Sequence, residues 1–188
     1  MNFKKWTGLV MLLSVLSFSA CNKTTDIFDY EDQYELEKPL IEQHALQNLS
    51  EPHFDENSGI WYQIIDPGES GSYEYRIEQS GEAKRLVYPK ITINYEGRLL
   101  DGTIFDQNHH PDGIEFPLNG LIQAWHVAFF PVKINEDQVN GLTENGLQIG
   151  SKIRFITPSM WGYGNQQQGN VPANSPLDFT ITVLDIKE

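Results

Sequence analysis

The central stretch of the chain runs Ile91-Thr92-Ile93-Asn94-Tyr95-Glu96-Gly97-Arg98-Leu99-Leu100-Asp101-Gly102-Thr103-Ile104-Phe105-Asp106. It begins with apolar residues that alternate with polar ones, which is the period of a strand that buries one face. Gly97 allows a bend or bulge in that strand. Asp101-Gly102 is a strong hairpin signal, because glycine adopts the positive φ of the turn without steric cost. We therefore predict a β-hairpin whose rim carries a ring and a carboxylate, Phe105 and Asp106.

Two later stretches add aromatic residues and glycines, namely Phe116-Pro117-Leu118-Asn119-Gly120-Leu121-Ile122-Gln123-Ala124-Trp125 and Trp161-Gly162-Tyr163-Gly164, the second followed by Gly169-Asn170-Val171-Pro172-Ala173-Asn174. In order and in most spacings, these stretches and the central one resemble the FKBP-type peptidyl-prolyl cis–trans isomerases. The pattern of that family is roughly Val-x-Tyr-x-Gly-x-Leu-x-Asp-Gly-x-x-Phe-Asp, then Phe-x-Leu-Gly-x-x-Ile-x-Gly-Trp, then Ala-Tyr-Gly and Ile-Pro. The resemblance covers about Tyr88 to Lys187, and no single motif carries it.

The resemblance implies an α+β fold, with a five- to six-stranded antiparallel sheet wrapped around a short helix. Alternation independently predicts strands at 59–65, 72–77, 153–157 and 177–183, and we expect the short helix at 125–130. The isomerase domain would span residues 59–188. Residues 131–145 depart from the family, which passes from helix to strand much sooner, so we predict an insertion there, near the mouth of the site.

The resemblance also assigns roles to matching positions. Five apolar side chains correspond to the walls of the substrate pocket, with the Trp as its floor: Tyr95, Phe105, Phe116, Trp125 and Val171. Two groups correspond to donors for a substrate carbonyl, the hydroxyl of Tyr163 and the backbone N–H of Ile122, which has Leu121 beside it. Asp106 corresponds to a carboxylate at the rim. We predict catalytic roles for Tyr95, Phe105, Asp106, Trp125 and Tyr163, and substrate contacts for Phe116, Leu121, Ile122 and Val171.

Alternatives to this assignment stay open. Each ring taken singly could be ordinary core, and three positions depart from the family pattern: Ala124, Asn170 and Ala173. The alternative function is a non-catalytic envelope chaperone or assembly subunit, which would use the same pocket or the 131–145 insertion to bind a partner. Retention of the residues matched to the pocket favours the enzyme.

The expected chemistry needs neither a cofactor nor a metal. Rotation about a peptide bond faces a barrier of roughly 18–20 kcal/mol from amide resonance, and uncatalysed exchange before proline takes tens of seconds or more. An apolar cradle can lower that barrier if it binds the twisted amide better than either planar form. His109 and His110 are adjacent and have no specific ligand spacing, so no metal site is predicted. The partners implied are proline-containing polypeptides and a macrolide inhibitor of the kind that this family binds.

The first twenty residues have the features of an export signal. Lys4 and Lys5 precede a short apolar run and small residues, and the only cysteine, Cys21, stands where cleavage would occur. This pattern resembles a bacterial lipoprotein signal, in which Cys21 would carry the lipid; the alternative is an ordinary secreted protein. We expect a lipid-anchored protein of the cell envelope, at the outer membrane of a Gram-negative bacterium on its periplasmic or surface face.

The net charge agrees with export and disfavours a nucleic-acid partner. The chain has 13 Lys+Arg and 26 Asp+Glu, a net charge of −13. Removing Lys4 and Lys5 leaves 11 basic against 26 acidic residues, a net charge of −15. Such a charge keeps a protein soluble and repels nucleic acid and anionic lipid. Membrane attachment would therefore depend on the lipid.

The segment between the signal and the domain divides in two. Residues 21–35 are acidic and poor in apolar residues, which predicts a tether, whereas 36–58 form a helical extension with Pro39 in the first turn. Its helix would carry one apolar stripe: Leu36, Leu40, Ile41, Ala45 and Leu49. That stripe must be covered, either by the chain's own domain or by a second copy in a homodimer through residues 36–49, and the second option is favoured because the family domain folds without such a helix.

Overall fold

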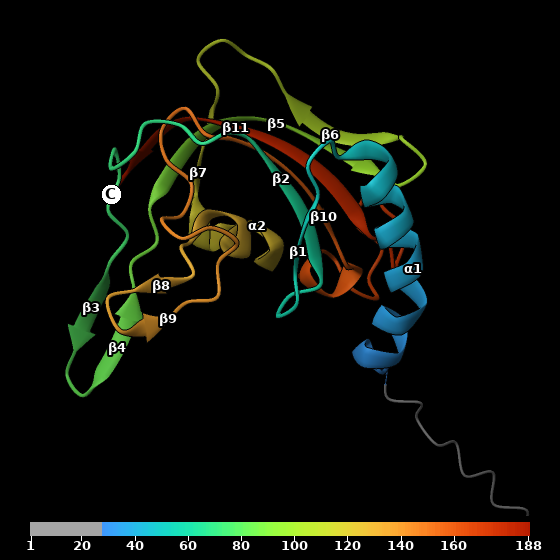
Figure 1. The fold of residues 1–188 in the computed structure, drawn as a ribbon, viewed down its shortest axis with the longest axis horizontal. Coiled ribbons are helices and arrows are strands. Elements are labelled where there is room, and N and C mark those ends of the chain that lie inside the picture. Colours follow the sequence, from blue (N-terminus) through green and yellow to red (C-terminus); the bar gives the residue numbers. More distant parts are fainter. Residues whose placement is uncertain (1–27) are drawn as a thin grey trace, which may run out of the picture.

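The computed structural model describes residues 28–188, in which a curved antiparallel sheet wraps around the short helix α2 (Gln123–Phe129) (Figure 1). The sheet has seven strands in the order β1-β2-β10-β11-β5-β6, and β7 also pairs with β5. Their bounds are β1 His53–Asp55, β2 Ile60–Asp66, β5 Lys90–Leu99, β6 Ile104–Asn108, β7 Ile114–Pro117, β10 Lys152–Thr157 and β11 Leu177–Lys187. The expected α+β architecture is confirmed, with one strand more than the largest number predicted.

Alternation along the strands puts one face of the sheet against α2. On β5, β10 and β11 the buried residues on this face are Ile91, Ile93, Tyr95, Ile153, Phe155, Leu177, Phe179, Ile181 and Val183. The helix contributes Trp125, Ala128 and Phe129 to the same core. Burial of each large apolar side chain stabilises the fold by about 1.5–3 kcal/mol. The strands expected at 153–157 and 177–183 are therefore present.

The central hairpin forms where it was predicted. The ladder between β5 and β6 shifts register between Gly97 and Arg98, which is the expected bulge. The turn closes with the Leu99 N–H donating to the Thr103 carbonyl at 2.9 Å, and Gly102 has a φ of +89°. A Cβ atom at Gly97 would lie 2.6 Å from Cζ of the Phe105 ring. Glycine at this position thus gives the aromatic rings room to meet over the strand.

The strand predicted at 72–77 is wrong. The structure places short strands later, β3 (Ile77–Ser80) and β4 (Ala83–Leu86), which pair with each other. Tyr75 is buried, and its hydroxyl donates to the Leu147 carbonyl at 2.8 Å. The alternation of aromatic residues in this segment therefore reflects side chains that pack under residues 130–148, without a strand partner for their backbone.

The N-terminal helix α1 (Tyr30–Asn48) begins earlier than expected, so residues 30–35 are helical and do not form a tether. The cause is the N-cap. The Asp29 side chain accepts hydrogen bonds from the backbone N–H groups of Glu31 and Asp32, and both of these acidic residues suit the positive end of the helix dipole. Pro39 lies inside the helix and not in its first turn.

The predicted apolar stripe on α1 is only partly correct. Ile41, Ala45 and Leu49 are buried against Trp61 and Ile156 on the outer face of the sheet. In contrast, the side chains of two leucines are largely exposed, Leu36 at 70% and Leu40 at 56%. The helix thus docks on its own domain, and its buried apolar residues are not available to a second copy. Among residues 28–188, no helix is both long and apolar enough to cross a membrane.

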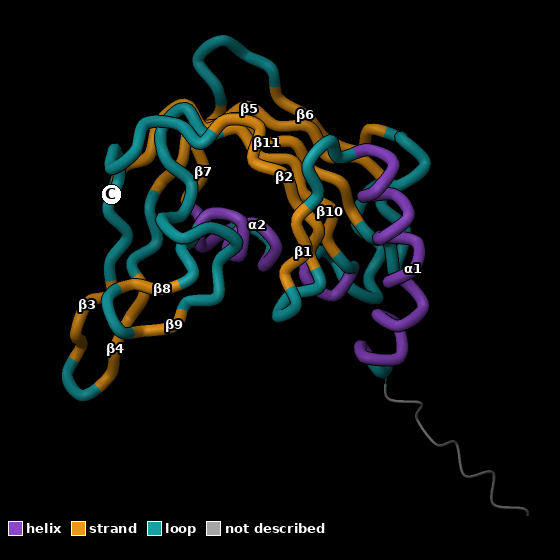
Figure 2. Tube along the Cα trace, in the orientation of Figure 1, coloured by secondary structure: helices purple, strands orange, loops and turns teal. Residues whose placement is uncertain are grey.

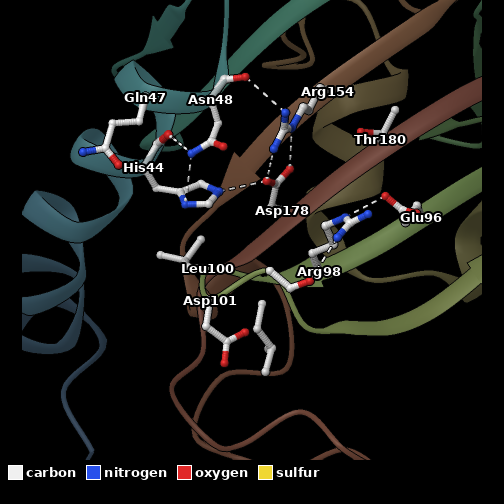
Figure 3. Close-up of a pocket in the computed structure, with 12 residues that line it drawn as sticks. His44, Gln47, Asn48, Glu96, Arg98, Leu100, Asp101, Arg154, Asp178 and Thr180 are labelled. Carbon is white, nitrogen blue, oxygen red and sulfur yellow. Dashed lines mark hydrogen bonds and ion pairs between the residues drawn. The ribbon is translucent and has the colours of Figure 1, made fainter.

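Polar contacts fix the C-terminal half of α1 (Figure 3). Asp178 of β11 is buried, and it accepts hydrogen bonds from Nε2 of His44 at 2.9 Å and from the Arg154 guanidinium at 2.7 and 3.0 Å. The same guanidinium donates to the Asn48 carbonyl at 3.1 Å, at the end of the helix. A buried carboxylate with several donors stabilises a specific docking geometry for α1.

The 131–145 segment forms a small hairpin of its own, with strands β8 (Lys133–Ile134) and β9 (Asp137–Gln138). Figure 2 shows this hairpin beside β3 and β4, and Nζ of Lys84 contacts the Asp137 carboxylate at 2.6 Å. The two hairpins extend together at one side of the sheet.

Candidate active site

A cavity of about 230 Å³ opens between the concave face of the sheet and α2. Its walls come from β5, β6, β7 and β11, the short helix η1 (Leu118–Gly120) with its following residues, α2, and the turn after η2 (Ser159–Trp161). The lining residues are Tyr95, Phe105, Asp106, Phe116, Gly120, Leu121, Ile122, Trp125, Tyr163 and Phe179. Eight of the nine pocket residues predicted from the sequence are in this set.

The rings around the cavity are packed edge to face. Trp125, the residue expected at the floor, is 5.4 Å from the Tyr95 ring and 5.5 Å from the Phe179 ring between centroids. Phe105 meets Phe179 at 5.6 Å with an interplanar angle of 87°. Such pairs contribute about 0.5–1.5 kcal/mol each beyond the burial of their area. The wall is therefore made of closely packed aromatic rings before any ligand enters.

Asp106 lies on β6 at the edge of this aromatic cavity, and its carboxylate oxygen Oδ2 accepts a hydrogen bond from the Tyr95 hydroxyl at 2.8 Å. Burial, followed by the Asp106 hydrogen bond and its negative charge, raises the pKa of Tyr95 well above its usual value. The Tyr95 hydroxyl consequently keeps its proton at neutral pH. This contact ties the rim carboxylate to the aromatic wall.

Tyr163 enters the cavity from the turn after η2. Burial first, and the negative charge of Asp106 second, raise the pKa of Tyr163, so its hydroxyl is a proton donor throughout the neutral range. Ile122 is the N-cap of α2, and within residues 28–188 its backbone N–H has no hydrogen-bond acceptor. Two hydrogen-bond donors are thus present in an otherwise apolar cavity.

Three sequence-based predictions fall outside this geometry. Val171 is buried in the neighbouring core and does not line the cavity; its backbone pairs with Gln168. No residue of 131–145 lines the cavity either, so the insertion was wrongly expected at its mouth; it packs against β3 and β4 instead. Cys21 lies outside the described residues.

Two lining residues were missed by the sequence analysis. Phe179 lies within the strand predicted at 177–183 but has no predicted role in the site, and Gly120 is quoted there without a role. The signal for Phe179 was available in principle, because an inward-facing ring on a strand beside β5 must share the concave face with Tyr95.

Among the described residues, no group of three or more His, Cys, Asp or Glu side chains is arranged to hold a metal.

Comparison with known proteins places this geometry in a family. The family model described as FKBP-type peptidyl-prolyl cis-trans isomerase matches residues 84–184, more than half of the chain. The chain is 29% identical over 158 residues to FkpA from Aeromonas hydrophila, covering 82% of this chain and 52% of that protein. It is 26% identical over 118 residues to Mip from Coxiella burnetii, covering 61% of this chain and 45% of that protein. The chain therefore spans about half the length of the curated relatives it matches.

Solved structures agree with the fold. The crystal structure of FkpA from Escherichia coli aligns with a TM-score of 0.55 at 22% identity, covering 84% of this chain and 62% of that chain. The crystal structure of AtFKBP13 aligns with a TM-score of 0.52 at 18% identity, covering 73% of this chain and 99% of that chain. At these identities the likeness concerns the fold alone. The matched family model nevertheless spans the residues that form the cavity, and the chain belongs to the FKBP-type peptidyl-prolyl cis-trans isomerase family.

Proposed function

We propose that this chain catalyses the cis–trans isomerisation of Xaa-Pro bonds in exported proteins and so assists their folding in the cell envelope. The observation that carries the proposal is the open aromatic cavity, to which separate segments of the chain contribute rings and two donors that have no acceptor among residues 28–188. Its volume, about 230 Å³, is below the roughly 300–1,000 Å³ of pockets for drug-sized ligands, which suits one small ring. Family membership supports the same activity.

The proposed mechanism uses binding energy and no covalent step. The proline ring enters the cavity over Trp125, within walls formed by Tyr95, Phe105 and Phe116. Water and strong donors favour the planar, charge-separated amide, so an apolar environment removes part of the preference for planarity. The twisted amide is then bound better than either planar form, which lowers the barrier.

Donors at the edge of the cavity orient the substrate. The hydroxyl of Tyr163 and the N–H of Ile122 donate to substrate carbonyls, with Leu121 beside them, and Asp106 acts at the rim. Because burial and then the Asp106 charge raise the pKa of Tyr163, its hydroxyl keeps its proton, and this contribution does not change with pH in the neutral range. Val171 packs in the neighbouring core, and the proposed pocket does not include it.

The test is a protease-coupled isomerisation assay on varied Xaa-Pro peptides with the protein starting at residue 22. Tyr163→Phe keeps the ring and removes one hydrogen bond worth about 0.5–1.5 kcal/mol, so kcat/KM should fall about two- to twelvefold. The matched control is Tyr88→Phe, whose ring packs on His126 away from the cavity and which should retain full activity. A wild type without activity on any of these peptides would replace this proposal with a binding subunit, for which residues 131–145 are the first surface to delete.

Binding is tested separately from turnover. Trp125 is almost completely buried at the floor of the cavity, so occupation of the cavity should change its fluorescence. We expect a saturable change with a proline peptide and with a macrolide of the kind this family binds. A Trp125→Phe variant identifies the part of the signal that comes from this indole, and identical titrations in both proteins would argue against binding at this floor.

We further propose that the protein is anchored by a lipid on Cys21, after removal of residues 1–20 as a signal. The supporting pattern is the basic start, the short apolar run and the position of the only cysteine. A homodimer through residues 36–49 would have to use the exposed leucines of that range, Leu36, Leu40 and Leu46, the first two of which belong to the predicted stripe. Sedimentation of the wild type beside Leu36→Lys/Leu40→Lys tests it, and a monomeric wild type ends that proposal.

A further inference from the structure

The segment that presents Tyr163 to the cavity is held from behind by α1. Glu37 lies on α1 with only 3% of its surface exposed. Its Oε2 accepts a hydrogen bond from the Ser159 backbone N–H at 2.8 Å, and its Oε1 accepts one from the Ser159 hydroxyl. Gln33 of the same helix also donates to Oε1, at 2.8 Å. A buried carboxylate is thus committed to one residue of η2.

Ser159 in turn organises the backbone on both sides of Tyr163. Its carbonyl accepts hydrogen bonds from the N–H of Gly162 at 2.9 Å and from the N–H of Gly164 at 2.8 Å. These two glycines flank the tyrosine directly. Every backbone polar group of Ser159 is therefore engaged, the N–H by α1 and the carbonyl by the turn. The position of the Tyr163 ring follows from where Glu37 holds Ser159.

Other contacts fix the same turn against the N-terminal extension. The Tyr30 ring covers Gly164: a Cβ atom on that glycine would lie 3.4 Å from Cε1 of Tyr30. The indole N–H of Trp161 donates to the Ser58 carbonyl at 2.7 Å. The neighbouring Gly59 lies directly beneath the Tyr34 ring of α1. The turn is thus anchored at several points, and α1 contributes to most of them.

The second half of α1 is anchored to the reverse side of the cavity wall (Figure 3). Asp178 accepts hydrogen bonds from His44 and Arg154, and it directly precedes Phe179, which lines the cavity, along β11. Because successive side chains of a strand point to opposite faces, Asp178 lies on the face opposite the cavity. The helix therefore has a fixed frame from which Glu37 can position η2. Without this frame, the hydrogen bonds that Ser159 donates to Glu37 would tie η2 to a helix that is not itself fixed.

We propose that Glu37 is a positioning residue for Tyr163, through which the N-terminal helix sets the geometry of the cavity. This inference rests on the proposed isomerase function for its effect on rate. Glu37 itself does not touch the cavity. Its removal leaves the buried N–H and hydroxyl of Ser159 without their acceptor, which favours rotation of η2 toward other partners. Tyr163 would then be displaced from the substrate carbonyl.

The experiment compares Glu37→Ala with Glu42→Ala, an exposed glutamate on the same helix, in the protein starting at residue 22. We expect Glu37→Ala to lower kcat/KM by about two- to twelvefold, the loss expected for the Tyr163 hydrogen bond. Glu37→Gln keeps one acceptor for Ser159 and should restore part of the activity, and Glu42→Ala should match the wild type. In a Tyr163→Ala background, Glu37→Ala should have less than about a twofold further effect.

A second readout does not depend on catalysis. The ring resonances of Tyr163, assigned by their loss in Tyr163→Phe, should shift in Glu37→Ala and stay in place in Glu42→Ala. If Glu37→Ala does not fold, Glu37→Gln and Ser159→Ala, which removes only the hydroxyl, are measured in the same way. The inference is overturned if the Tyr163 ring resonances do not shift in Glu37→Ala. It is also overturned if the double variant loses kcat/KM by the product of the two single losses, from Glu37→Ala and from Tyr163→Ala. An inactive wild type would refute the proposed function, while the ring resonances would still decide the placement of Tyr163.

Discussion

Asp106 is exposed, and its carboxylate accepts a hydrogen bond from the Tyr95 hydroxyl. Replacing it with valine removes that hydrogen bond and the negative charge at the rim, and it disturbs little packing. We expect kcat/KM for Xaa-Pro peptides to fall roughly tenfold, equivalent to about 1.4 kcal/mol. The free energy of unfolding, measured by urea titration, should fall by only about 0.5–1.5 kcal/mol.

The matched control for Asp106→Val is Asp112→Val, a change of the same kind on the exposed loop that follows β6. The two variants lose the same charge, so a general effect of net charge would appear in both. Equal activity of Asp106→Val and the wild type would show that the rim carboxylate does not contribute to catalysis.

At the level of single residues, the sequence was sufficient where a residue both faces the cavity and belongs to a recognisable motif. Phe105, Trp125 and Tyr163 are of this kind. Val171 belongs to the motif but points into the core, because a turn with Gln168 determines its direction. Glu37 belongs to no motif, since its partner is the backbone of a residue more than a hundred positions away. Long-range contacts of this type cannot be inferred from local pattern.

At the scale of one element, the central strand β5 depends on Gly97. A Cβ atom there would lie 2.6 Å from Cζ of Phe105 and 2.9 Å from Cε1 of Phe179, two rings that line the cavity. Gly97→Ala should therefore lower the free energy of unfolding by about 1–3 kcal/mol, the usual range for overpacking, and should lower activity as well. Gly120→Ala is the control for stability, because the nearest atom to its Cβ is 3.7 Å away. Equal melting temperatures for the two variants would contradict the claim that position 97 needs glycine to make room for these rings.

The link between α2 and η1 should make stability depend on pH. Nε2 of His126 donates to the Leu118 carbonyl at 2.8 Å, and burial lowers the pKa of His126 below its ordinary value of 6.5. The folded state disfavours the charged imidazole, so neutral His126 contributes to the stability of the fold. That contribution is complete above about pH 6.5 and is lost as the pH falls through the folded pKa. Between pH 7.5 and 5.5 the melting temperature of the wild type should fall more than that of His126→Gln, which keeps a donor for Leu118. Parallel curves would exclude His126 as the cause.

Alternation predicted the long strands well because their two faces have different environments, the α2 core on one side and mostly polar contacts on the other. The same pattern failed at 72–77, where aromatic residues pack beneath a loop and the backbone has no strand partner. On α1, apolar spacing pointed to Leu36 and Leu40, whereas the docked face includes the polar Glu37. A hydrophobic pattern identifies buried apolar residues, and it cannot identify a buried carboxylate whose partner lies elsewhere.

For the whole molecule, the early start of α1 brings the folded domain close to the proposed anchor. Only eight residues, 22–29, lie between Cys21 and Tyr30, and the nine Cα–Cα steps would span at most about 30 Å even when fully extended. A chain with a net charge of −13 before processing is repelled by anionic headgroups. The proposed attachment would therefore depend on the lipid and not on surface charge, and stable attachment by lipid takes more than one acyl chain.

Cys21→Ser tests this anchor directly. The variant should move from the detergent phase to the aqueous phase in phase partitioning of cell extracts, because serine cannot form the thioether that carries the lipid. Asn22→Ser, which changes the adjacent residue and keeps the cysteine, should partition with the wild type. The isomerase activity of the released Cys21→Ser protein should equal that of the wild type, since α1 and the cavity both lie downstream of the anchor. If wild type and Cys21→Ser partition equally, the protein is not held by a lipid at this residue, and its strong negative charge would then favour a freely soluble exported form.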